Sequence, residues 1–156
     1  RRTGRHDRTM IDTIKQLRGE TGASIGQIRS ALEESGGDAS KARVLLAEKL
    51  GAMAEKKATR EVRAGLVDAY VHSNGKIGVL LELLCETDFV ARNPEFKKLA
   101  HDLAMHIAAM APEHLAALEG QDSIHQPGKS IRDVVREAIG KFGENIRVGD
   151  FTRLEL

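Results

Sequence analysis

Some residues of the chain could do chemistry, but their spacing argues against a catalytic site. Cys85 and His72 would have to lie about 3 Å apart to act as a nucleophile and its base. If Asn74–Gly75 is the turn of a hairpin, His72 pairs with Ile77, which is eight residues from Cys85. That separation is roughly 26 Å along a strand. Cys85 is therefore predicted to be a small buried hydrophobe.

Two further patterns approach known ligand sites without meeting their requirements. Gly128–Lys129–Ser130 ends like a phosphate-binding loop, but Ser123 stands where that loop needs a glycine. His101 and His106 are five residues apart, which is wrong for two ligands on one helical face, so we expect surface or packing histidines. A single cysteine excludes a zinc site built from several cysteines. The sequence predicts no cofactor, no metal and no enzymatic activity.

The composition limits the possible partners. Residues 1–9 contain four arginines and one aspartate, and without them the formal net charge of +1 becomes −2. We interpret these nine residues as a tag or disordered tail. A body near neutrality disfavours direct nucleic-acid binding. No apolar run approaches the roughly 20 residues of a membrane span, and one cysteine suits a reducing compartment. A cytoplasmic protein without membrane contact is expected.

The N-terminal part, residues 10–51, is predicted to form a module of three short helices. Ser24 and Gln27 have the spacing of a capping box, and Asp38 can cap the third helix. Ile25 has two possible roles, as a core side chain or as an apolar contact on the surface. The first helix is expected from about residue 11 to Gly19.

The following segment, residues 52–64, mixes both charges without an apolar stripe, which is typical of a solvated linker, helical or extended. A basic nucleic-acid patch is the alternative. Residues 65–156 are predicted to be an α+β core with a small three-stranded antiparallel sheet packed with helices. Asn74–Gly75 is a strong hairpin signal, and Asn93–Pro94 marks the start of a helix.

The C-terminal part is predicted to hold a loop, a helix and a strand. Residues 111–129 have weak periodicity and are interpreted as a loop, and the next helix lies between Ser130 and Gly143. The last strand is expected from an alternation of apolar and polar positions: Ile146, Val148, Thr152 and Leu154. Both faces of the hairpin are apolar, and the helices can cover only one. The other face predicts a homodimer formed through the sheet.

The connection between Cys85 and Asn93 must turn from strand to helix, and it holds Asp88 and Phe89. Burying a phenylalanine side chain is worth roughly 1.5–3 kcal/mol. Phe89 is thus predicted to lie either in the core or in the pocket of a partner.

Three stretches resemble the elongation factor Ts family. Thr87–Asp88–Phe89–Val90–Ala91–Arg92–Asn93 resembles its signature loop, and Phe142–Gly143–Glu144–Asn145–Ile146 its second signature, with Phe142 in place of the usual isoleucine. Thr21–Gly22–Ala23 resembles part of its ubiquitin-associated-like three-helix module. The resemblance implies a guanine-nucleotide exchange factor that binds the GTPase elongation factor Tu and promotes GDP release during translation elongation. Short members of the family resemble two-fold dimers.

The resemblance also implies which residues contact the partner. Phe89 would enter an apolar crevice near the magnesium and phosphate site of the GTPase, and Asp88 would help to place the loop. The implied contact residues are Arg18, Ile25, His72, Thr87, Asp88, Phe89, Val90, Phe142 and Gly143. An alternative is an adaptor whose three-helix module binds a ubiquitin-like or other protein, and a third hypothesis is an enzyme that uses Cys85.

Overall fold

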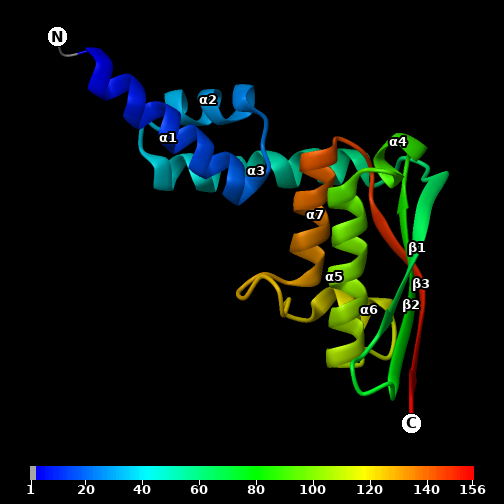
Figure 1. Ribbon diagram of the computed structural model, residues 1–156. Coiled ribbons are helices and arrows are strands. Elements are labelled where there is room, and N and C mark those ends of the chain that lie inside the picture. The colour runs from blue at the N-terminus through cyan, green and yellow to red at the C-terminus, as the bar shows by residue number, and fades with distance from the viewer. Residues whose placement is uncertain (1–2) are drawn as a thin grey trace.

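The computed structural model describes residues 3–156, with side chains from residue 9 onward. Helices lie at the N-terminal end, and a three-stranded antiparallel sheet packs against further helices (Figure 1), which confirms the predicted α+β class. In chain order the elements are α1 (Thr3–Thr21), α2 (Ile25–Glu34), α3 (Ala39–Lys57), β1 (Ala64–Val71), β2 (Ile77–Cys85), α4 (Asp88–Ala91), α5 (Pro94–Met110), α6 (Leu115–Gly120), α7 (Ile131–Phe142) and β3 (Arg147–Glu155).

The predicted caps of the N-terminal helices are confirmed. Ser24 and Gln27 form the capping box of α2, and the Asp38 carboxylate accepts hydrogen bonds from two amides of the first turn of α3. These helices bury a small aliphatic core: Ile14, Leu17, Ala23, Ile28, Ala31, Leu32, Ala42, Leu46 and Leu50. Ile25 is 44% exposed, so the interpretation of this side chain as core is wrong.

Helix α1 is longer than predicted at both ends. It begins at Thr3, so the part of the expected tail that the structure describes is helical, whereas residues 1 and 2 lie outside the described residues. It continues past Gly19 to Thr21, and Gly22 then takes a positive φ of 67°. Charged and polar residues such as arginine are compatible with a helix, so a missing apolar stripe did not mean a missing helix.

Helix α3 runs through the predicted boundary near residue 51 without a break. Leu50 belongs to the N-terminal core, whereas Ala54, one turn later, is buried in the core of the sheet and its helices. Gly140 of α7 lets the two helices approach closely, because a Cβ there would lie 2.7 Å from Cδ2 of Leu50. The division into a module, a linker and a core stays a prediction, but the first part of the linker is this helix.

The hairpin has the predicted register. Leu66 pairs with Leu83, and the amide of His72 donates to the carbonyl of Ile77 at 2.9 Å. The strand order is β1-β2-β3. Helix α5 packs on β1 and β2, and α7 packs on α3. Helices α5, α6 and α7 lie on one side of the sheet in Figure 1, and α4 lies at one end of the strands.

Strand β3 differs from the predicted alternation because it contains a β-bulge. Leu81 pairs with Phe151, but Leu83 pairs with Val148, so one extra residue of β3 lies between these pairs. The bulge shifts the phase of the strand. Val148 and Phe151 therefore face the helices, whereas Thr152 and Leu154 lie on the uncovered face. The prediction that Val148 and Thr152 share a face is wrong for this reason.

Residues 111–129 are not only a loop, because they contain helix α6. Its Leu118 is fully buried, and the Nδ1 atom of His114 accepts a hydrogen bond from the amide of Ala117 at 3.1 Å. His106 of α5 is buried beside this segment, and its Nε2 atom lies 3.0 Å from the side-chain oxygen of Gln121. Burial lowers the pKa of His106 below its ordinary value, which keeps the ring neutral near pH 7.

Within residues 3–156, no helix has both the length and the apolar character that are needed to cross a bilayer.

Candidate functional site

Phe89 lies on the surface at the corner between β2 and α5. The corner contains the single-turn helix α4, which Thr87 caps and which begins with Asp88 and Phe89. Val90 and Ala91 are buried beneath it. The Phe89 side chain is 84% exposed, the highest value among the large hydrophobic residues apart from the C-terminal Leu156. Of the two positions that the sequence allowed for this ring, the core of its own subunit is excluded.

The start of α5 fixes the other end of the corner. The Asn93 side chain accepts a hydrogen bond from the amide of Glu95 at 2.8 Å, and Pro94 occupies the first turn, as predicted. The amide of Asn93 also donates to the carbonyl of Val90 at 2.9 Å. Phe89 is therefore held between a buried strand and a long capped helix, with little freedom to fold back.

The two signature stretches meet in space although 57 residues separate Thr87 from Glu144. The Glu144 carboxylate accepts hydrogen bonds from the amides of Glu86 and Thr87 and from the Thr87 hydroxyl. In the opposite direction, the amide of Asn145 donates to the Glu86 carboxylate at 2.6 Å. Sequence reasoning placed Glu144 and Asn145 in a signature but gave them no role. The only sequence signal for them was that resemblance.

Phe142 and Gly143 lie next to this network. The Phe142 ring is half-buried and packs edge-on against the buried ring of Phe96, with 5.9 Å between the centroids. Gly143 ends α7 with a positive φ of 74°, and its carbonyl accepts a hydrogen bond from the Lys57 ammonium of α3. Both residues are thus tied to the protein's own core and to α3.

The other predicted contact residues lie far from Phe89. His72 is exposed at the opposite end of the hairpin, where its Nδ1 atom lies 3.0 Å from the Tyr70 hydroxyl oxygen. Strand β2 separates the two ends by nine residues, or roughly 30 Å. Arg18 and Ile25 lie on α1 and α2. The structure brings Thr87–Val90 together with Phe142–Gly143, whereas His72 lies at the other end of the hairpin and Arg18 and Ile25 lie on the N-terminal helices.

The possible chemistry of Cys85 and of the histidines is restricted by their surroundings. Cys85 is fully buried and its thiol lies 3.2 Å from the Thr87 carbonyl. Burial, with the nearby Glu144 charge, raises the pKa of this thiol, which opposes thiolate formation. His101 contacts Asp68 at 2.9 Å. Among the side chains that the structure describes, those of residues 9–156, no three His, Cys, Asp or Glu residues form a group that could hold a metal ion.

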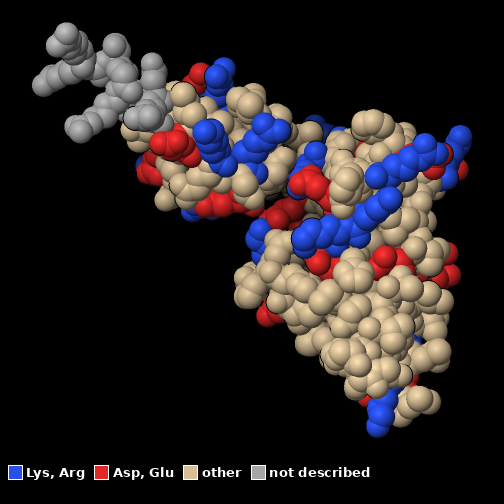
Figure 2. Space-filling view, in the orientation of Figure 1, with Lys and Arg blue, Asp and Glu red and all other residues tan. Residues whose placement is uncertain are grey.

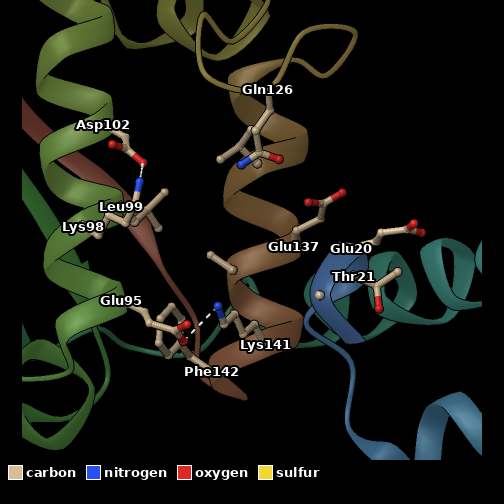
Figure 3. Close-up of a pocket in the computed structure, with 13 residues that line it drawn as sticks. Glu20, Thr21, Glu95, Lys98, Leu99, Asp102, Gln126, Glu137, Lys141 and Phe142 are labelled. Atoms are coloured by element: carbon tan, nitrogen blue, oxygen red, sulfur yellow. Dashed lines mark hydrogen bonds and ion pairs between the residues drawn. The ribbon is translucent and has the colours of Figure 1, made fainter. Parts of the chain in front are cut away.

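A cleft between the end of α1 and helices α5 and α7 was not predicted. Figure 2 shows a hollow between the N-terminal helices and the core, and Figure 3 shows the residues that line it. Its apolar lining residues include Leu99 and Phe142. Its two lysines are paired, Lys141 with Glu95 at 2.8 Å and Lys98 with Asp102 at 2.6 Å. A phosphate group would have to break these pairs, so the cleft is poorly suited to a nucleotide.

Comparisons with known proteins agree with the two signatures. Residues 86–156 match the model of a family described as Elongation factor TS. Elongation factor Ts of Rubrobacter xylanophilus is 38% identical, and the match covers 95% of this chain and 99% of that protein. Elongation factor Ts of Thermotoga neapolitana is 42% identical, with 94% and 96% covered. That of Coprothermobacter proteolyticus is 48% identical over 85% of this chain and 68% of that protein. The chain belongs to the elongation factor Ts family of translation elongation factors.

Proposed function

We propose that this protein is a guanine-nucleotide exchange factor that binds elongation factor Tu and promotes the release of GDP. The observation that carries the proposal is the 84% exposed Phe89 ring on a corner that is anchored on both sides. A large aromatic side chain in water has no stabilising role in its own subunit. Burying it in a partner's crevice would gain roughly 1.5–3 kcal/mol, which is typical of the anchor of an interface.

The exchange mechanism is a thermodynamic coupling. Phe89 inserts into an apolar crevice near the magnesium and phosphate site of the GTPase, and exposed Asp88 orients the turn by hydrogen bonding. The protein thereby favours a state of the GTPase that holds GDP weakly. Because such coupling is reciprocal, GDP must weaken the binding of the exchange factor by the same factor. Val90, which is 4% exposed, anchors the turn from below rather than contacting the GTPase.

The N-terminal helices supply a second contact surface. Ile25 is 44% exposed and, with Arg18, would dock on the nucleotide-binding domain. Helix α3 is continuous from Leu46, in the core of the N-terminal helices, to Ala54, in the core of the sheet and its helices. This continuity sets the position of Ile25 relative to Phe89, so both surfaces can engage one partner without a large ordering cost. His72 and Phe142–Gly143 complete the proposed contact set.

A binding measurement tests this coupling. Titration calorimetry is done with this chain and elongation factor Tu, first without nucleotide and then with saturating GDP. We expect the affinity to fall by at least tenfold with GDP, which corresponds to a coupling of about 1.4 kcal/mol. Equal affinity in the two titrations would contradict an exchange role while still allowing a simple binding protein.

We further propose that two copies associate through the uncovered face of the sheet. The exposed apolar side chains of this face are Val67, Val71, Leu80 and Leu154, which are 54–71% exposed. They come from all three strands and form a continuous surface of a kind that single soluble chains rarely leave in water. A two-fold axis would place the same surface of each copy against the other.

The change Leu80→Lys puts a charge in the middle of this face. We expect sedimentation equilibrium to give about twice the 17.0 kDa chain mass for the wild type and the single-chain mass for the variant. The matched control is Val44→Lys, because Val44 is 58% exposed but lies on α3, away from the sheet. A single-chain mass for the wild type at high micromolar concentration would contradict the dimer.

A further inference from the structure

Helix α4 cannot maintain its own shape. It has four residues, Asp88–Ala91, whereas isolated helices shorter than about 12 residues are marginal in water. Its cap is also weak, since the amide of Val90 lies 3.5 Å from the Thr87 hydroxyl oxygen. Something outside α4 must hold the turn on which Phe89 stands.

The Glu144 carboxylate makes the contacts that are needed. Its Oε2 atom accepts hydrogen bonds from the amides of Glu86 at 3.1 Å and Thr87 at 3.0 Å. Its Oε1 atom accepts one from the Thr87 hydroxyl at 2.6 Å. Hydrogen bonds to an ionised carboxylate are roughly twice as strong as neutral ones. The three bonds define the backbone entry into α4.

The hydroxyl contact has a second effect. When the Thr87 proton points to Glu144, the lone pairs of the hydroxyl oxygen are left to accept from the amide of Val90. The carboxylate therefore sets the direction of the cap, although Glu144 itself does not bond to α4. Without Glu144, the Thr87 hydroxyl would be free to rotate. Its hydrogen bond with the amide of Val90 would then weaken, although Glu144 does not contact Val90 itself.

Glu144 is itself anchored. The next amide along the chain, that of Asn145, donates to Oε1 of Glu86 at 2.6 Å, so the two segments are bonded in both directions. The Asn145 side chain is 1% exposed, and its Nδ2 atom donates to the carbonyls of Ala58 at 3.3 Å and Arg60 at 2.7 Å. These carbonyls belong to the segment that follows α3. Hydrogen bonds to that segment therefore hold the residues around Glu144 in position.

We propose that Glu144 is a positioning residue that holds the turn from Thr87 to Val90 and so keeps the Phe89 ring extended toward the partner. This inference rests on the proposed function for its consequence, but the positioning itself can be measured on the free protein. The contact residue is Phe89, and Glu144 acts only through the turn.

The first test measures amide hydrogen exchange in the Glu144→Ala variant. We expect the amides of Thr87 and Val90 to exchange at least tenfold faster, while core amides such as that of Leu103 are unchanged. Glu144→Gln keeps an acceptor oxygen and should restore part of the protection. The matched control is Glu137→Ala, which removes a glutamate that pairs with Lys129 instead. Unchanged protection at Val90, or an equal loss in the core, would overturn the positioning role.

The second test measures the affinity for nucleotide-free elongation factor Tu in a double-mutant cycle with Phe89→Ala. We expect Glu144→Ala to weaken binding roughly tenfold or more in the wild type, because misplacement of a contacting group is costly. In the Phe89→Ala background the same change should have little effect. Equal effects in both backgrounds would overturn the inference. If the wild type does not bind at all, the proposed function fails, and the hydrogen-exchange result still decides the positioning role.

Discussion

The Phe89→Ala variant is expected to lose most of its ability to release GDP from elongation factor Tu while it folds as the wild type does. The Phe89 ring is 84% exposed, so its removal leaves no cavity, and we expect the free energy of unfolding to change by less than about 0.5 kcal/mol. An interface anchor contributes about 2 kcal/mol or more, which corresponds to a release rate about 30-fold lower.

The measurement for Phe89 combines release of a fluorescent GDP with urea unfolding. Phe89→Leu keeps part of the apolar volume and should give an intermediate release rate. Ile124→Ala is a control that also removes exposed apolar surface, because Ile124 is 42% exposed in the segment after α6. A Phe89→Ala variant that unfolds more easily, or that releases GDP as fast as the wild type, would show that the ring has no role at an interface.

The opposite result is expected for Phe96, seven residues further along the chain. This ring is fully buried at the start of α5, and it packs edge-on against Phe142 with an interplanar angle of 81°. Replacement of a buried phenylalanine by alanine typically costs about 3–5 kcal/mol, because burial is lost and a cavity remains. For a protein of this size we expect a thermal midpoint lower by roughly 6 to 20 °C.

Calorimetric unfolding tests the Phe96→Ala prediction, and Phe89→Ala is its matched control. Both variants lose the same atoms, so only the surroundings of the two rings differ. Since Phe142 is the first residue of the second signature and packs on Phe96, Phe96→Ala should also disturb that region. If the Phe89→Ala and Phe96→Ala variants were equally stable, this would contradict the difference in burial between the two rings.

Local signals gave much of the fold correctly. The capping residues Ser24, Asp38 and Asn93 marked helix starts, and the Asn74–Gly75 turn fixed the register of the hairpin. These features depend on residues that are close in the sequence, where hydrogen-bonding and turn preferences decide the outcome.

Features that depend on contacts between residues far apart in the sequence could not be predicted from local signals. The bulge in β3 places one more residue between Val148 and Phe151 than between their partners on β2, and no local pattern marked it. Helix α3 passes Gly51 because Leu50 and Ala54 are buried against different neighbours. Helix α6 is too short for a periodic signal and depends on the burial of Leu118.

The candidate site could also be predicted only in part from the sequence. Chemistry alone left Phe89 with two possible places, and only the structure excludes the core. The network around Glu144 joins residues 57 to 59 positions apart, so no spacing rule could find it. Val90 belonged to the predicted contact set, but its burial makes it an anchor.

One measurement tests the central claim most directly. Elongation factor Tu that carries a fluorescent GDP is mixed with this protein and excess unlabelled GDP in a stopped-flow instrument, and the rate of fluorescence loss is recorded. Our account predicts a rate that rises with the concentration of the protein and then saturates. A rate that stays at the spontaneous value at every concentration would contradict the claim that this protein opens the nucleotide site.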